Sequence, residues 1–156
     1  MIKGTFPIEK FRELETPFYY YDMKVLRDTL DTIKKEVSKY ENFHVHYAIK
    51  ANANPKILKV IREAGLGADC VSGGEVRASV EAGFPNDKIV FAGVGKTDKE
   101  INYALDHDIF CFNVESVPEL EIITRGIICQ HYFLKFLIFY FCCDYAVFRA
   151  KNHQFL

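Results

Sequence analysis

The sequence predicts an α/β fold with a parallel sheet, and three observations support this prediction. A strand-like segment followed by a helix-like segment recurs four times, with strand centres near residues 47, 69, 90 and 112, about 21 to 22 residues apart. The strand segments are apolar without alternation, as in a sheet buried on both faces. Residues that cap helices stand where the helical segments begin. Such a repeat fits an open, doubly wound sheet or half of a (β/α)8 barrel, which is complete at about 250 residues.

The first helix and the first strand come before the regular part of the repeat. Apolar residues that recur at steps of four, three and four predict one buried face of a helix: Leu26, Leu30, Ile33 and Val37. Asp22 is the expected cap of this helix. Residues 43–49 are rich in aromatic and β-branched residues and predict the first strand. Asn54 and Pro55 open the next helix, because proline suits the first helical position, and Gly65 ends it.

The other three units share one pattern. Their predicted strands are residues 68–71, 89–92 and 109–112. Each strand is followed by a capping box, in which a Ser or Thr and a Glu three residues later satisfy the first amide groups of a helix. The three boxes are Ser72 with Glu75, Thr97 with Glu100, and Ser116 with Glu119. The helix after Thr97 is expected to bury Ile101, Ala104 and Leu105.

Composition and charge argue against several classes of function. The 156 residues include 20 Lys and Arg against 21 Asp and Glu, so the chain has no basic surplus for nucleic acid or anionic membranes. Five cysteines without metal-ligand spacing fit a reduced, cytoplasmic protein better than a secreted disulfide scaffold. No signal peptide is visible at the N-terminus.

Two charged residues stand where parallel α/β folds collect their reactive groups, at the carboxyl ends of strands. Lys50 ends the first strand, and the apolar run before it would partly desolvate its amine, which favours the neutral form that attacks carbonyls. A solvated lysine is the alternative. Asp69 lies inside the second strand, where a buried carboxylate needs a partner. That partner is either Lys50 or nearby backbone amides.

Two glycine-containing segments suggest anion sites only weakly. Residues 93–97 (GVGKT) resemble the end of a P-loop, but Val90 stands where the pattern needs glycine, so no nucleoside triphosphate site is expected. No GxGxxG fingerprint occurs either. Residues 72–74 (SGG) open a helix and offer an approach for an anion, although a simple helix start explains them as well.

His44 and His46 flank one residue of the first strand, so they share a face and could bind a metal. No third ligand is evident near them in the sequence. Two histidines with ordinary hydrogen-bond partners are therefore the preferred interpretation, and no metal is expected.

Several motifs together resemble a known family. They are TPFYYYD at 16–22, YAIKAN at 47–52, GADCVSGGE at 67–75, KIVFAG at 88–93 and NVES at 113–116. In order and spacing they are similar to the fold-type III pyridoxal-phosphate-dependent decarboxylases of ornithine, diaminopimelate and arginine, and most of all to the members that act on diaminopimelate. The resemblance implies a TIM-type (β/α)8 barrel like that of alanine racemase, truncated here to about its first four units.

The resemblance also implies a cofactor and a reaction. The cofactor is pyridoxal 5'-phosphate, with Lys50 as the catalytic residue that binds it covalently and Ala48 and Asp69 lining it. The reaction is decarboxylation of meso-2,6-diaminopimelate to L-lysine, in lysine biosynthesis, by a cytoplasmic homodimer without nucleic-acid or membrane partners. Relatives with similar first halves act on ornithine, arginine or carboxynorspermidine, which stay alternatives. A non-catalytic half-barrel that associates with a partner is a further alternative.

The resemblance covers residues 15–123 and then stops. The last 33 residues hold nine aromatic residues, three of the five cysteines and one acidic residue. Their uninterrupted apolar run, residues 136–143, is shorter than the roughly 20 residues that span a membrane. We therefore predict an extended segment at 1–22, the first part of the cofactor-binding barrel at 23–123, and a tail at 124–156 that is not family sequence. An inactive N-terminal fragment is the expected state of this chain.

Overall fold

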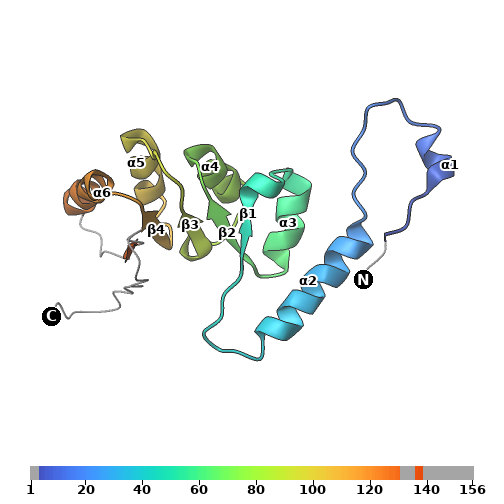
Figure 1. Ribbon diagram of the computed structural model, residues 1–156, viewed down its shortest axis with the longest axis horizontal. Coiled ribbons are helices and arrows are strands. Elements are labelled where there is room, and N and C mark those ends of the chain that lie inside the picture. The colour runs from blue at the N-terminus through green and yellow to red at the C-terminus, as the bar shows by residue number, and fades with distance from the viewer. Residues whose placement is uncertain (1–3, 131–135, 139–156) are drawn as a thin grey trace. The chain divides into compact units, whose positions relative to one another are not determined.

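The computed structural model describes residues 4–130 and 136–138 (Figure 1). The chain divides into two compact units, residues 1–43 and residues 44–156. The first unit contains α1 (Ile8–Phe11) and α2 (Met23–Val37). The second unit contains β1 (His46–Ala48), η1 (Ile49–Ala51), α3 (Pro55–Glu63), β2 (Gly67–Cys70), α4 (Gly73–Glu81), η2 (Asn86–Lys88), β3 (Ile89–Phe91), α5 (Asp98–Asp106), β4 (Cys111–Val114), α6 (Val117–Gln130) and β5 (Phe136–Ile138).

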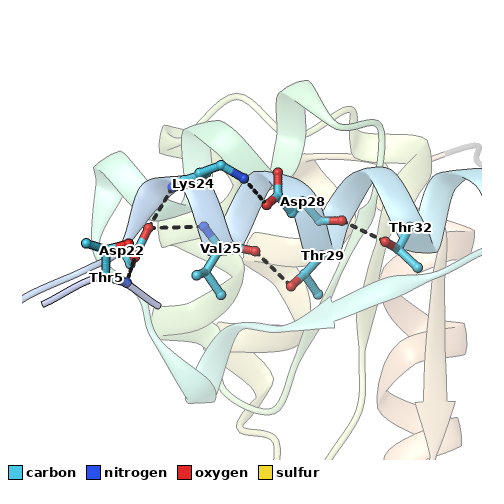
Figure 2. A network of polar contacts seen from close by, with 7 residues as sticks. All are labelled: Thr5, Asp22, Lys24, Val25, Asp28, Thr29 and Thr32. Carbon is cyan, nitrogen blue, oxygen red and sulfur yellow. Dashed lines mark hydrogen bonds and ion pairs between the residues drawn. The ribbon is translucent and has the colours of Figure 1, made fainter. Parts of the chain in front are cut away.

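Helix α2 begins at the predicted cap, Asp22. Its carboxylate accepts hydrogen bonds from the backbone amides of Lys24 at 3.0 Å and Val25 at 3.1 Å, and from the amide of Thr5 at 2.7 Å (Figure 2). These amides, that of Thr5 first, hold the pKa of Asp22 below its ordinary value. The cap therefore also anchors the segment before the helix. Of the predicted apolar face, Leu30 is buried and the others are less covered.

The five strands of the second unit form one parallel sheet in the order β1-β2-β3-β4-β5. Each strand pairs with the next one along the chain, so the order never reverses. Because parallel crossovers are right-handed, a sheet of this order places all its helices on one face. Figure 1 shows α3, α4, α5 and α6 following one another along the sheet. This arrangement is that of a partial (β/α)8 barrel, and a doubly wound sheet, whose order reverses, is excluded for these strands.

The predicted helix starts of the second unit are confirmed at four positions. Asn54 caps α3, Ser72 caps α4 and Thr97 caps α5, and Ser116, directly before α6, accepts from the amide of Glu119. Only the pair of Thr97 and Glu100 forms the complete reciprocal box. In α4 the carboxylate of Glu75 accepts from the amide of residue 71, one position before the cap.

The core lies between the sheet and its helices. The buried strand residues on this side are Ala68, Cys70, Ile89, Phe91, Phe112 and Val114. The buried helix residues include Ile57, Leu58, Ile61, Val76, Ile101, Ala104 and Ile123. Each large side chain buried in this way contributes about 1.5–3 kcal/mol to folding. The predicted buried stripe of α5 is correct for Ile101 and Ala104, whereas Leu105 is only half-buried.

Each of the four predicted strands differs from the observed strand by at least one residue, and the differences are largest at β1 and β4. Strand β1 is limited to His46–Ala48, and the chain then turns into η1. Strand β4 starts at Cys111, two residues later than predicted, because the turn before it continues through Asp108, whose φ of 46° is left-handed. Ile109, predicted as strand, is buried before the strand begins.

The end of the chain is described only in part. Helix α6 runs to Gln130, and β5 pairs in parallel with β4. The rest of the tail predicted at 124–156 lies outside the described residues, so its departure from the family stays a prediction. Within the part that the structure describes, none of the helices combines the length and the apolar character needed to cross a membrane.

Candidate functional site

The register of the sheet brings the two predicted strand residues of the site together. Ala48 pairs with Asp69, Asp69 with Val90, and Val90 with Cys111. Paired residues of a parallel ladder share a face, so these four lie on the side of the sheet opposite the buried residues Ala68 and Phe91. Ala48, Asp69 and Val90 are partly exposed. This side, which is the inner face of the partial barrel, is the candidate site.

A ring contact shows that the inner face is concave at the amino-terminal end of the strands. The rings of His46 and Phe110 stack with centroids 6.3 Å apart at an interplanar angle of 18°. His46 is on the first strand and Phe110 directly precedes the fourth. In a flat sheet three strand spacings would keep them about 14 Å apart. The sheet therefore curves as a barrel does. The two rings cover the inner face at the amino-terminal end of the strands, and the candidate site lies toward the carboxyl end.

His46 has the environment of a structural histidine. Burial lowers its pKa, and the negative charge of Asp69 opposes this change. Its ring occupies the space beside Gly67, where a Cβ would collide with it. Among the described residues no three His, Cys, Asp or Glu side chains are grouped to hold a metal ion.

Lys50 lies directly after β1, inside the short turn η1. The residue before it, Ile49, is completely buried, whereas Lys50 is exposed. The expectation that the apolar run would partly desolvate Lys50 is wrong for the described chain, because the turn directs alternate residues differently from a strand. The amine is accessible at the carboxyl end of the sheet.

Asp69 makes neither of the contacts that the sequence suggested. Within residues 4–130, no ion pair joins it to Lys50 and no backbone amide donates to its carboxylate. The side chain is half-exposed, so its charge is partly solvated. A carboxylate in this state keeps its acceptor positions for a bound group.

Sequence reasoning missed a buried ion pair beside the site. Lys96 Nζ donates to Glu119 Oε1 at 2.6 Å, and the two side chains are 1% and 7% exposed. The same ammonium donates to the carbonyls of Gly93 at 2.7 Å and Asn113 at 2.8 Å. All three protons of Lys96 are therefore used inside the protein, which removes it as a phosphate ligand. In the sequence, the pair was indicated only by Lys96, whose role no motif explained, and by Glu119 at the start of the helix in the next β/α repeat.

The ion pair also explains why the third capping box is incomplete. The amide of Glu119 donates to Ser116 Oγ at 3.4 Å, as predicted. The carboxylate of Glu119, however, accepts from Lys96 and from the amide of Glu115 instead of closing the box on Ser116.

Asn113 is a second residue that sequence reasoning did not single out. It lies two residues after Cys111 on β4 and therefore on the inner face. Its side-chain oxygen Oδ1 is buried and has no hydrogen-bond partner among the described residues. The inner face thus combines a partly exposed carboxylate and an unpaired amide oxygen, and the turn after β1 adds an accessible amine.

Comparison with known proteins identifies the family to which the chain belongs. Residues 24–137 match the family model described as "Pyridoxal-dependent decarboxylase, pyridoxal binding domain". The chain belongs to the pyridoxal-dependent decarboxylase family.

Individual members of the decarboxylase family match over most of this chain. The diaminopimelate decarboxylase of Bacteroides thetaiotaomicron is 71% identical over 124 residues, which cover 80% of this chain and 32% of that protein. The crystal structure of diaminopimelate decarboxylase from Helicobacter pylori complexed with L-lysine matches with a TM-score of 0.75 and 36% identity, over 84% of this chain and 33% of that one. The diaminopimelate decarboxylase of M. jannaschii matches with a TM-score of 0.79 and 31% identity, over 85% and 32%. The chain spans about a third of the length of the relatives it matches.

The residues of the inner face fit the cofactor of this decarboxylase family. Pyridoxal phosphate carries an aldehyde, which needs a primary amine, and polar groups, which need hydrogen-bond partners. Lys50 offers an exposed amine, and the orphaned oxygen of Asn113 is a buried acceptor in want of a donor.

Proposed function

We propose that this chain carries the first part of the cofactor-binding barrel of an enzyme that decarboxylates meso-2,6-diaminopimelate to L-lysine with pyridoxal phosphate. The observation that carries the proposal is the 71% identity to a diaminopimelate decarboxylase over 124 residues. The H. pylori relative, whose structure was determined with L-lysine, supports the same reaction class. More distant neighbours such as an arginine decarboxylase, at 24% identity, show only that the fold is shared.

Lys50 is the residue that holds the cofactor. Its amine is exposed at the carboxyl end of the sheet, where a carbonyl group can reach it. Pyridoxal phosphate, when bound, supplies an electron sink for the electron pair left when carbon dioxide departs. Lys50 fixes the position of that sink relative to the strands.

Ala48 and Asp69 line the cofactor on the two strands beside Lys50. Their Cα atoms are register partners, so both side chains face the same side of the sheet. Ala48 has a single methyl group and leaves space next to Lys50. Asp69 adds a negative charge and acceptor oxygens, which stabilise positive charge in a bound group and orient its hydrogen bonds.

The complete enzyme acts as a cytoplasmic homodimer in this proposal. The assembly is supported by the family resemblance alone. The location is supported by the ordinary charge balance and by Cys70, a reduced thiol in the helix-facing core. Burial raises the pKa of Cys70 to about 12, which leaves it unreactive.

The role of Lys50 is tested by trapping. The purified chain is incubated with pyridoxal phosphate, reduced with borohydride, and mapped by peptide mass. We expect the adduct on Lys50 and its complete loss in Lys50→Ala. The matched control is Lys56→Ala, which removes another exposed lysine six residues away, in the first turn of α3.

Two results decide the outcome. An adduct confined to Lys50 and retained in Lys56→Ala supports the proposal. Labelling scattered over several lysines, and equal in Lys50→Ala, contradicts the role of Lys50 in this chain.

A further inference from the structure

The carboxamide of Asn113 is the buried polar group that the assigned residues do not explain. Among the residues that the structure describes, its Oδ1 is the single buried side-chain nitrogen or oxygen without a hydrogen-bond partner. An unpaired buried acceptor destabilises a folded protein, and native structures keep few of them. Its retention inside a strand points to a donor that is not part of the described chain.

The backbone of Asn113 is held by a buried lysine from the loop between β3 and α5. Its carbonyl accepts from Lys96 Nζ at 2.8 Å, and Lys96 is fixed by the buried pair with Glu119. The same ammonium lies 5.5 Å from the ring centroid of Phe91, a residue of the helix-facing core. The unpaired oxygen therefore belongs to an anchored residue and not to a loose surface side chain.

The register places Asn113 beyond the row of paired inner-face residues, toward the carboxyl end of the sheet. Ala48, Asp69, Val90 and Cys111 form one row across the sheet. Asn113 lies two residues beyond Cys111 on β4, and Lys50 lies two residues beyond Ala48 in the turn η1. Below these two positions, the inner face is curved enough for His46 and Phe110 to stack. Asn113, near the end of the fourth strand, and Lys50, in the turn after the first strand, thus both lie at the carboxyl end of this curved sheet.

We infer that Asn113 Oδ1 accepts a hydrogen bond from an N–H or O–H group of the bound cofactor or of its amino-acid substrate. The inference rests on the proposed function, since it requires a ligand on the inner face. An amide oxygen can only accept, so the bound group must present a donor. Ammonium, ring N–H and hydroxyl groups of the cofactor and the amino acid are of this kind.

The test uses Asn113→Leu in the full chain, because leucine keeps the size and removes the acceptor. Without ligand, we expect the thermal midpoint to rise by about 2–4 °C, since an unsatisfied buried atom is gone. With pyridoxal phosphate, we expect the dissociation constant to increase about five- to tenfold, as for a lost hydrogen bond. A merely structural asparagine would instead lower the midpoint when it is replaced.

Two control variants accompany this test. Asn86→Leu makes the same change at an exposed position at the opposite end of β3 and should leave both quantities unchanged. Asn113→Asp keeps an acceptor and should retain most of the affinity.

Addition of L-lysine separates the two sources of the donor. A weaker affinity in the absence of lysine assigns the donor to the cofactor. An unchanged cofactor affinity with a reduced spectral response to lysine assigns it to the amino acid, and either result supports the inference. Unchanged affinity and response, or a lowered midpoint, overturn it. If the unsubstituted chain binds no better than Lys50→Ala, the proposed function fails first and the inference falls with it.

Discussion

At the scale of single residues, Lys96 is the side chain whose role differs most from its sequence context. It follows two nearby glycines in a segment that resembles a phosphate-binding loop, yet it is almost completely buried against Glu119. Removing one member of such a pair leaves an unpaired charge in the core, which costs about 3–5 kcal/mol. Replacing both members by apolar residues leaves no such charge.

We predict strong coupling between these two positions. Lys96→Met alone and Glu119→Leu alone should each destabilise the chain, and the double variant should lose about 1–3 kcal/mol less than the sum of the two. Urea unfolding of the four proteins measures this difference. Strictly additive costs would mean that the pair is solvated and that its role as an anchor for Asn113 is wrong.

At the scale of secondary-structure elements, Glu100 joins the amino termini of two neighbouring helices. Within α5 its carboxylate accepts from the amide of Thr97 at 3.0 Å and from the Thr97 hydroxyl at 2.7 Å. It also accepts from the amide of Gly73, the first residue of α4, at 2.8 Å. A Cβ at position 73 would collide with the Glu100 side chain, so only glycine permits this contact.

The link through Glu100 should make stability depend on acid pH. The backbone amide of Thr97, then its hydroxyl, and then the amide of Gly73 lower the pKa of Glu100 below its ordinary value of 4.5. A carboxylate with a lowered pKa in the folded state stabilises the fold above the unfolded pKa and loses that contribution as pH falls through the folded one. Glu100→Gln, which lacks a second acceptor oxygen, should cost about 1 kcal/mol at pH 7.

Urea midpoints measured between pH 7 and pH 3 check this prediction. The difference between the wild type and Glu100→Gln should shrink below pH 4.5. Glu81→Gln is the control, because Glu81 is exposed in the last turn of α4, where a negative charge does not stabilise the helix; its replacement should therefore cost no stability at pH 7 or at pH 3. A difference that stays constant with pH would show that the carboxylate charge does not contribute.

Features that depend on residues close together in the sequence were predictable, and features that depend on particular turns or on distant residues were not. Helix starts at Asp22, Asn54, Ser72 and Thr97 were predictable because a cap bonds to amides within three residues of it. The start of β4 was not, because it depends on the left-handed turn at Asp108.

The same distinction applies to the candidate site, whose motif residues were predictable and whose exposure and side-chain pairing were not. Motifs identified Lys50, Ala48 and Asp69, and the register brings Ala48 and Asp69 together on one face. The exposure of Lys50 was missed because a turn, which the pattern did not indicate, replaces the end of the strand. The unpaired oxygen of Asn113 was missed because pairing depends on residues far away in the sequence.

At the scale of the whole molecule, the second unit is a curved parallel sheet that leaves its inner face partly exposed. Strands β1 and β5 are the two edges of the described sheet. Unpaired edges of this kind recruit other chains. The residues on the inner face are those that a complete barrel would enclose with its remaining strands.

We therefore predict that the 156-residue chain, produced alone, is oligomeric or poorly soluble and forms no lysine from diaminopimelate. Size-exclusion chromatography with light scattering should give a mass well above the 18.0 kDa of one chain. The decarboxylation assay should remain at background with pyridoxal phosphate present. A monodisperse monomer that releases lysine would contradict both expectations.

The uninterrupted strand order has a consequence for folding during synthesis on the ribosome. Among the described residues, side-chain hydrogen bonds join successive β/α repeats, as from Arg62 to the carbonyl of Ala82 and from the amide of Gly73 to Glu100. A segment emerging from the ribosome therefore meets its partner already synthesised, and no later segment has to insert between earlier ones. Assembly can follow translation one β/α repeat at a time, and the contact between Phe110 and His46 across the curved sheet becomes possible only once Phe110 has been synthesised.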